Sequence, residues 1–220
     1  MEAPRPDRFR EAVRRHYAGL APYYQRKANR ACMQAYAHLV ERYLPGASRL
    51  LELGAGTSEP LSRLAPPLSV ALDLSVPMLC GRGSASASAR VAADAMDLPF
   101  QDASFDAVLC INLLEHVPEP ARVVTEAARV LSTGGLFLAV TPNGDVVWLF
   151  EALERLHLKL PEGPHRFLSC REFVALAAPL DMIEHHRFLA FPVGPRRLVQ
   201  FSDSLACGRG LFQYLLARKP

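Results

Sequence analysis

The clearest chemical signal in the sequence is a glycine-rich turn followed by an aspartate. Residues 50–58 read Leu-Leu-Glu-Leu-Gly-Ala-Gly-Thr-Ser, so an apolar strand pattern ends in two closely spaced glycines. Glycine lets the backbone turn tightly and approach a ligand, and the start of a following helix offers unpaired N–H groups to an anion. Asp73 comes 19 residues after Gly54, at the end of the next apolar segment, where a carboxylate can accept hydrogen bonds from both hydroxyls of a ribose. These residue types at this spacing predict a binding site for a nucleoside.

The same layout occurs in proteins that bind nicotinamide dinucleotides. Their fingerprint requires a third glycine at position 59, where this chain has Glu59, and a glutamate there would repel the pyrophosphate. A nicotinamide-dependent oxidoreductase is therefore an alternative hypothesis and not the leading one. A non-catalytic cofactor-binding regulator is a second alternative, because it would keep the same residues and lack turnover.

The elements that must position these residues alternate between short apolar strands and helices. Such alternation is typical of a parallel sheet covered by helices on both faces. Strands are expected at 49–53, 70–74, 90–93, 105–111, 136–141, 182–191 and 211–217. Helices are expected at 58–64, 75–80 and 118–131, and Ser169 with Glu172 matches a capping box that starts another helix reaching about Ala178. The prediction is a Rossmann-like α/β fold with seven strands, mostly parallel, in which the last strand is antiparallel because 192–210 shows no crossover helix.

The chain is expected to divide into a helical N-terminal lid, residues 1–46, and a Rossmann-like domain, residues 47–220, with a cap helix near 145–160. Gly19 and Pro22 interrupt the two helical patterns of the lid, which we expect to become ordered over the cofactor. Residues 1–50 hold 10 Lys and Arg against 4 Asp and Glu, whereas the whole chain has a net charge of only +3. A solvated helix face and attraction of an anionic substrate or membrane surface both remain open.

Composition narrows the class of protein. The chain has 220 residues, of which 50% are hydrophobic and 21% charged, so it is long enough for a sizeable core and is not a disordered protein. It shows neither an apolar stretch of membrane-spanning length nor a secretory signal, and its five cysteines are widely spaced. We therefore expect a cytoplasmic protein with reduced thiols, and no metal site.

Further motifs follow the glycine turn in a fixed order. Glu52-x-Gly54-x-Gly56 is followed by Asp73 and by Asp94-Ala95. The remaining motifs are at 21–24, 98–100 with 104–106, 112–117, 131–135 and 165–169. Together they resemble the class I S-adenosylmethionine-dependent methyltransferases, and more closely the small-molecule branch that includes ubiquinone and menaquinone biosynthesis methyltransferases. Two positions depart from the pattern, because Ser58 replaces a glycine of the first motif and Gln25 replaces an acid after the N-terminal tyrosine.

The resemblance implies S-adenosylmethionine as the cofactor and a small molecule as the methyl acceptor. In this family the first motif contacts the methionine part, the position of Asp73 holds the ribose, and the position of Asp94 lies near the adenine amine. The implied cofactor contacts are Tyr24, Glu52, Gly54, Ala55, Gly56, Asp73, Leu74, Met78, Asp94, Ala95 and Asn112.

The protein must position the acceptor, exclude water and, for a hydroxyl or an acidic carbon, remove a proton. His116 is the first candidate base because it follows the fourth strand, and His165 is the second because its segment resembles the family's substrate-side loop. A structural role is the alternative for both histidines. 

The methyl acceptor is expected to be a small molecule and not a nucleic acid. No Pro-Cys dipeptide occurs, and residues 112–115 lack the Pro-Pro-aromatic motif of enzymes that act on bases. The apolar and aromatic residues of the expected cap, among them Trp148, Phe150 and Phe167, favour a lipophilic or aromatic small molecule. Oxygen, nitrogen and carbon acceptors remain open.

Overall fold

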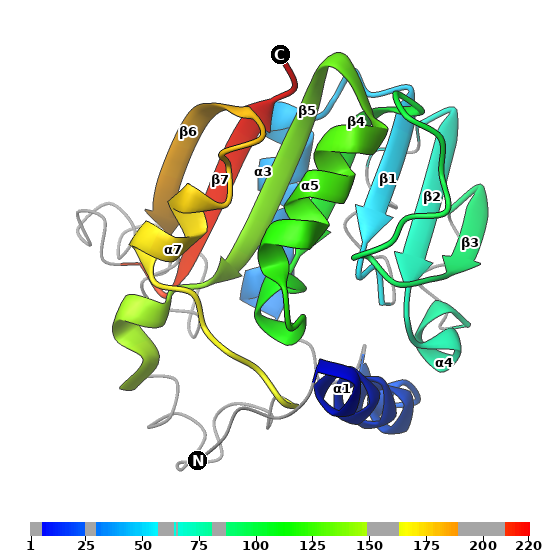
Figure 1. The fold of residues 1–220 in the computed structure, drawn as a ribbon, viewed down its shortest axis with the longest axis vertical. Coiled ribbons are helices and arrows are strands. Elements are labelled where there is room, and N and C mark those ends of the chain that lie inside the picture. The colour runs from blue at the N-terminus through cyan, green and yellow to red at the C-terminus, as the bar shows by residue number, and fades with distance from the viewer. Residues whose placement is uncertain are drawn as a thin grey trace.

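A seven-stranded sheet forms the centre of the molecule (Figure 1). The computed structural model describes residues 6–24, 30–56, 64, 66–80, 87–148, 163–188 and 210–220. In chain order the strands are β1 (Arg49–Leu53), β2 (Leu68–Asp73), β3 (Ala89–Ala92), β4 (Phe105–Ile111), β5 (Leu131–Pro142), β6 (Asp181–Phe188) and β7 (Phe212–Arg218). Their order across the sheet is β3-β2-β1-β4-β5-β7-β6.

The five strands from β3 to β5 are parallel, whereas β7 runs antiparallel to both β5 and β6. This confirms the predicted seven-stranded, mostly parallel sheet with an antiparallel last strand. β5 begins at Leu131, five residues before the predicted start, because Leu131 pairs with Phe105 ahead of a register shift. Gly134, at φ 79°, lies in this irregular stretch and lets the strand continue through it.

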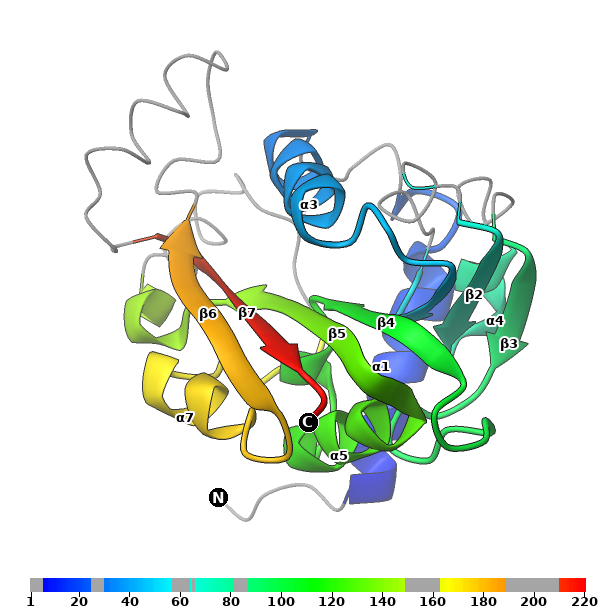
Figure 2. The same ribbon diagram turned by 90° about the horizontal axis from the view of Figure 1, so that it is seen from above.

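Helices cover both faces of the sheet (Figure 2). α5 (Pro120–Val130) and α7 (Cys170–Ala175) lie on one face and α3 (Arg30–Tyr43) on the other. The predicted capping box at the start of α7 is present, with Ser169 and Glu172 bonded reciprocally. α7 ends at Ala175, three residues earlier than predicted, because the next residues form tighter turns in which each N–H bonds to the carbonyl three positions before it.

Two apolar layers, one on each face, hold these helices in place. On the α5 side, Val123 and Ala127 pack with Leu51 and Val108, and all four side chains are buried. On the α3 side, Val40 is buried in a cluster that includes Leu50, Leu109, Leu138 and Val140 of the strands. Successive strand residues therefore alternate between two covered faces, which explains why the strands read as continuous apolar runs. Each buried valine contributes roughly 1.5–3 kcal/mol relative to an exposed one.

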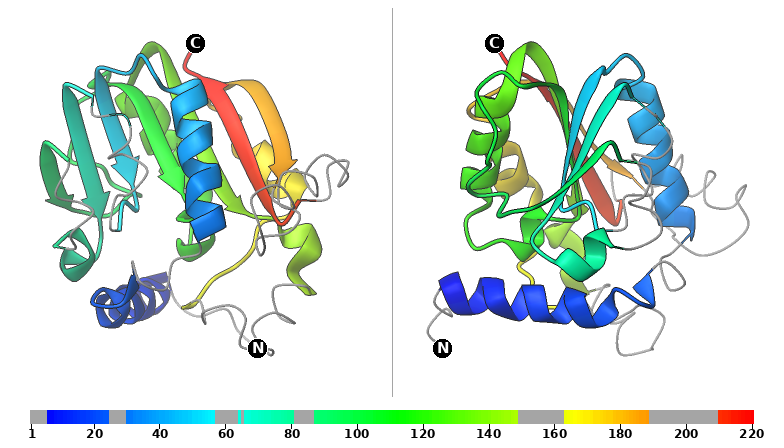
Figure 3. Two further views of the ribbon diagram at one scale, coloured as in Figure 1. Left: turned by 180° about the vertical axis from the view of Figure 1, so that it is seen from behind. Right: turned by 90° about the vertical axis from the view of Figure 1, so that its right-hand side faces the viewer.

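α1 (Pro6–Leu20) takes a different position from α3. It lies crosswise at the carboxyl ends of the parallel strands, as the two views in Figure 3 show, next to α4 (Val76–Leu79). A short 3-10 helix, η3 (Leu114–His116), follows β4, and another, η4 (Gly144–Val146), follows β5. α1 therefore faces the edge of the sheet at which open parallel sheets bind ligands.

Several predicted features lie outside the described residues. These are the helix at 58–64 apart from residue 64, most of the cap helix after residue 148, the end of the sixth strand after residue 188, and the departures Ser58 and Gln25. Across the described part of the chain, no helix combines the length and apolar character that a membrane crossing requires. The cysteines described there, Cys32, Cys80, Cys110 and Cys170, are all free thiols.

Candidate active site

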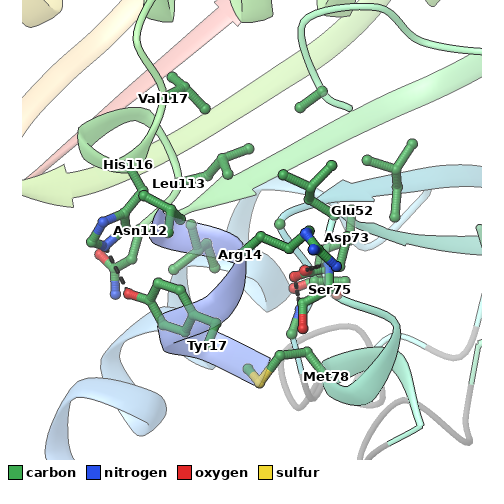
Figure 4. A pocket seen from close by; sticks show the side chains of 18 of the residues that line it. Arg14, Tyr17, Glu52, Asp73, Ser75, Met78, Asn112, Leu113, His116 and Val117 are labelled. Atoms are coloured by element: carbon green, nitrogen blue, oxygen red, sulfur yellow. Dashed lines mark hydrogen bonds between the residues drawn. The ribbon is translucent and has the colours of Figure 1, made fainter. Parts of the chain in front are cut away.

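A pocket lies between α1 and the carboxyl ends of β1, β2, β3 and β4 (Figure 4). Of the sequence-predicted site residues, all eleven expected cofactor contacts and His116 line it. They are Tyr24, Glu52, Gly54, Ala55, Gly56, Asp73, Leu74, Met78, Asp94, Ala95, Asn112 and His116. The topology brings them together because the carboxyl ends of parallel strands share one edge of the sheet.

The glycine turn forms the floor of the pocket. Gly54 and Gly56 have φ angles of 65° and 49°, in the left-handed region that glycine adopts at little cost. A Cβ atom on Gly54 would lie 3.0 Å from the side chain of Leu113, and one on Gly56 would lie 3.1 Å from Met78. The backbone conformation favours glycine at both positions, and at Gly54 the Leu113 side chain also leaves no room for a Cβ atom.

Asp73 is fixed beside this turn at the end of β2. Its Oδ2 accepts a hydrogen bond from the Gly56 N–H at 2.9 Å, and its Oδ1 accepts one from the Ser75 N–H at 2.8 Å. Burial raises the pKa of the Asp73 carboxyl group, and the two N–H donors act in the opposite direction. The carboxylate is thus held rigidly, with lone pairs left for donors in the pocket.

Asp94 lies in the loop after β3, and its carboxylate accepts hydrogen bonds from both that loop and α1. Its Oδ1 accepts from the Met96 N–H at 2.9 Å, whereas Oδ2 accepts from Nη1 of Arg10 at 2.7 Å. Arg10 was not among the predicted site residues. The ion pair ties the N-terminal half of α1 to one end of the pocket.

The pocket wall contains buried polar atoms with no hydrogen-bond partner among the described residues. Asn112, at φ 49°, donates through Nδ2 to the Tyr36 hydroxyl at 3.1 Å. Its Oδ1, like the hydroxyl oxygen of Ser75, is buried and has no hydrogen-bond partner among the described residues. Burial holds the pKa of Tyr36 well above its ordinary value, so Tyr36 is a neutral phenol here. Glu52 is also buried in this wall, at 3% exposure.

Buried polar groups in proteins are nearly always hydrogen-bonded. Orphaned acceptors in a pocket wall therefore fit a ligand that carries N–H and O–H donors. A nucleoside joined to an amino acid has hydroxyl groups and an ammonium group of this kind, so the residues present fit S-adenosylmethionine.

The two candidate bases occupy different places. His116 lines the pocket, and its Nε2 lies 2.8 Å from the hydroxyl oxygen of Tyr17 on α1. His165 is not among the described lining residues; its ring stacks against Phe167 at 4.3 Å, and its Nδ1 lies 2.7 Å from the carbonyl oxygen of Gly163. The role of His165 as a base therefore stays a prediction. Its ring centroid lies 6.2 Å from that of His116.

Sequence reasoning missed the side chains that α1 contributes to the pocket. They are Arg10, Val13, Arg14 and Tyr17. Their spacing of three or four residues places them on one face of a helix, so a helical periodicity search restricted to residues 6–20 could have grouped them. Their position over the glycine turn depends on tertiary packing, which the spacing does not reveal.

Comparison with known proteins adds independent information about this chain. Residues 51–139 match the family described as methyltransferase domain. The ubiquinone biosynthesis O-methyltransferase of Xanthomonas axonopodis pv. citri is 33% identical over 150 residues, which cover 62% of this chain and 62% of that protein. Over these residues the chain is similar in sequence to S-adenosylmethionine-dependent methyltransferases.

Solved structures show the same methyltransferase fold. A possible histamine N-methyltransferase of Thermotoga maritima has a TM-score of 0.74 at 21% identity, covering 94% of this chain and 100% of that one. The N-methyltransferase NodS of Bradyrhizobium japonicum, solved in complex with S-adenosylhomocysteine, has a TM-score of 0.68 at 13% identity, covering 95% of this chain and 99% of that one.

The match to the methyltransferase domain family distinguishes between the two cofactor hypotheses. S-adenosylmethionine is the family's cofactor, which confirms that prediction over a nicotinamide dinucleotide. The chain spans between 37% and 63% of the length of the curated relatives it matches, most of them ubiquinone biosynthesis O-methyltransferases.

Proposed function

We propose that this chain transfers the methyl group of S-adenosylmethionine to a small lipophilic or aromatic acceptor. The observation that carries the proposal is one pocket lined by two groups of residues: a glycine turn with fixed carboxylates and buried acceptor atoms, and aromatic side chains with a histidine. The first group suits the cofactor, and the second suits an apolar acceptor next to it.

Residues of the β1 and β2 ends would hold the cofactor. Asp73 would accept from the ribose hydroxyls, Asp94 with Ala95 would meet the adenine, and the backbone of Gly54 and Gly56 would allow close approach. Glu52 and the orphaned Oδ1 of Asn112 would accept from the ammonium group of the methionine part. S-adenosylmethionine, when bound, supplies a methyl carbon on a cationic sulfur that leaves with the bonding electron pair.

The chain itself positions the methyl acceptor and excludes water from the pocket. α1 crosses the pocket and places Val13 and Tyr17 in its lining, so the helix closes the side that would otherwise face solvent. We propose that α1 is the moving part of the predicted N-terminal lid, whereas α3, whose Tyr36 and Val40 are buried against the sheet, is fixed.

The acceptor side is apolar and aromatic. Met33, Tyr36, Ile111 and Val117 line the pocket, and no cluster of three or more His, Cys, Asp or Glu side chains that could hold a metal occurs in the described part of the chain. The relative named for O-methylation in ubiquinone biosynthesis supports an oxygen on such a molecule as the acceptor atom.

Two measurements test the proposed function. Calorimetry with S-adenosylmethionine, S-adenosylhomocysteine and NAD should show binding of the first two and not of the third. The protein incubated with methyl-labelled S-adenosylmethionine and a small-molecule extract should then give a labelled, organic-soluble product. Binding of S-adenosylhomocysteine with no labelled product from any extract would favour the non-catalytic regulator instead.

A further inference from the structure

Tyr17 and His116 meet across the pocket although they lie 99 positions apart in the sequence. Tyr17 comes from α1 and His116 from η3, and their rings are 5.2 Å apart in an edge-on arrangement with an interplanar angle of 77°. Figure 4 shows the tyrosine hydroxyl directed at the imidazole, next to Asn112 and on the opposite side of Arg14 from Asp73. The pair therefore lies at the acceptor end of the pocket.

The second nitrogen of His116 fixes the direction of this hydrogen bond. Nδ1 lies 3.0 Å from the carbonyl oxygen of Pro164, and a carbonyl oxygen can only accept. In the neutral imidazole the proton is therefore on Nδ1, which leaves Nε2 as the acceptor. It follows that the Tyr17 hydroxyl donates to Nε2 of His116.

This direction changes the role available to His116. Its basic nitrogen is covered by Tyr17, so a molecule in the pocket meets the phenol oxygen before it meets the imidazole. A phenol oxygen carries two acceptor lone pairs in addition to its hydrogen. Tyr17 can thus accept a proton from the pocket side while it gives its own proton to His116.

We propose that Tyr17 and His116 form a proton relay and that the methyl acceptor carries an un-ionised hydroxyl group. This rests on the proposed methyl transfer. The acceptor O–H proton passes to the Tyr17 oxygen, the Tyr17 proton passes to Nε2 of His116, and the phenol is regenerated. The electron pair left on the acceptor oxygen forms the new bond to the methyl carbon, while the imidazolium that results keeps its Nδ1–H bond to Pro164.

The surroundings of the pair suit this role. His116 is 6% exposed, so the bulk solvent does not compete for its proton. Three further titratable rings lie near the pair, and they belong to His16, Tyr24 and His165. A neutral amine acceptor would not need these groups, because it attacks through a free electron pair before any proton leaves.

The pairing can be tested without any ligand. Nitrogen NMR of the histidine side chains, assigned with His116→Gln, should show Nδ1 protonated and Nε2 as a hydrogen-bonded acceptor. Tyr17→Phe should shift the Nε2 resonance towards that of an unbonded acceptor nitrogen. Tyr23→Phe is the matched control, because Tyr23 is 50% exposed and is not among the lining residues described, and it should leave the resonance unchanged. A proton on Nε2, or no response to Tyr17→Phe, would overturn the relay whatever the activity.

The catalytic part is tested with catechol and 4-nitrocatechol as probe acceptors. With catechol, Tyr17→Phe and His116→Gln should each lower kcat roughly 100-fold or more with KM changed only a few fold, since this is the usual contribution of proton removal. The double variant should be no slower than the slower single variant, because both residues serve one proton path. With 4-nitrocatechol, which ionises more easily, the losses should shrink.

The outcomes separate the relay from the proposed function. Losses that multiply in the double variant, or that are equal for both catechols, would contradict a relay. Methylation of aniline-type amines with no methylation of phenols would overturn the relay and leave the proposed methyl transfer intact. Binding of S-adenosylhomocysteine without turnover of any acceptor would remove both proposals, even if NMR showed the hydrogen bond.

Discussion

Nη1 of Arg10 lies 2.7 Å from Oδ2 of Asp94, so the carboxylate that we assign to adenine also holds α1 in place. The Arg10 side chain is 43% exposed and that of Asp94 19%, so the pair contributes on the order of 1 kcal/mol or less. An ion pair of this strength can hold the helix near the pocket and still open on the timescale of ligand exchange. We therefore expect cofactor binding and the position of α1 to be coupled through the Asp94 side chain.

Loss of this ion pair should loosen α1. In the free protein, Arg10→Gln should speed hydrogen exchange across residues 10–20, because one of the polar contacts between the helix and the rest of the pocket is gone. Arg15→Gln is the matched control, since Arg15 pairs with Glu11 on the same helix and is not among the described lining residues. Equal exchange in the two variants would show that Arg10 does not hold the helix.

Ligand binding should slow exchange in the same segment. We expect S-adenosylhomocysteine to protect residues 10–24 of the parent protein, because Arg10, Tyr17 and Tyr24 line the pocket it would fill. Exchange in β4, which is buried in the sheet, provides the internal reference. If exchange across 10–24 is the same with and without ligand, α1 is not a lid.

Removal of the Asp73 carboxylate should weaken cofactor binding. Asp73→Ala removes the acceptor for two hydroxyls and should cost about 1.5–3 kcal/mol, or roughly 10–150-fold in the Kd for S-adenosylhomocysteine by calorimetry. Asp102→Ala, whose side chain is 76% exposed and pairs with Arg129 away from the pocket, is the control and should leave the Kd unchanged. An unaltered Kd in Asp73→Ala would reject the ribose assignment.

The glycine turn should tolerate no side chain. Gly54→Ala and Gly134→Ala both place a Cβ at a positive φ, which costs about 1–2 kcal/mol. At Gly134 the added Cβ would meet no atom within 4 Å among the described residues other than its chain neighbours, whereas at Gly54 it would meet Leu113 at 3.0 Å. Urea unfolding should therefore show a further loss of about 1–3 kcal/mol in Gly54→Ala, and only this variant should lose S-adenosylhomocysteine binding. Equal losses in the two variants would mean that backbone strain alone is involved.

Stability should depend on pH through Asp106, at the opposite end of β4 from the pocket. Arg49 donates to its Oδ1 from Nη2 at 2.6 Å, and the bonds from the Arg49 guanidinium hold the pKa of the carboxyl below its ordinary value. Because the folded pKa is lowered, the stabilisation is present above the unfolded pKa of about 4 and is lost as the pH falls through the folded pKa.

The Asp106→Asn variant measures this contribution. Its free energy of unfolding should lie about 1 kcal/mol below that of the parent at pH 7. The difference should narrow below about pH 4, as the native Asp106 takes up its proton. A difference that stays constant from pH 7 to pH 2 would assign the loss to packing and not to charge.

The sequence was most informative where local patterns decide structure. The observed bounds of β1 and β4 equal the predicted ones, because each is an apolar run bounded by turn residues. The capping box at Ser169 needed only two residues three positions apart.

The features that were missed depend on contacts between distant segments. Nothing in the spacing of α1 shows that Arg10 reaches Asp94, 84 positions later, or that Tyr17 covers Nε2 of His116. From the sequence we expected His116 to act as a base on the acceptor itself. The direction of its hydrogen bond instead supports a role in which Tyr17 lies between the acceptor and Nε2 of His116. The orphaned Oδ1 of Asn112 likewise appears only when the neighbours of that atom are known.

The place of β7 in the sheet has a consequence for synthesis on the ribosome. β7 is the last strand in chain order, yet it pairs with β5 on one side and β6 on the other. Until residue 218 has emerged, β5 presents an open edge and β6 lacks the strand that joins it to the sheet. Open edges of this kind pair readily with other chains. A chain whose translation stalls before residue 212 should therefore expose the β5 edge to pairing with other chains, whereas synthesis of β7 covers that edge and joins β6 to the sheet.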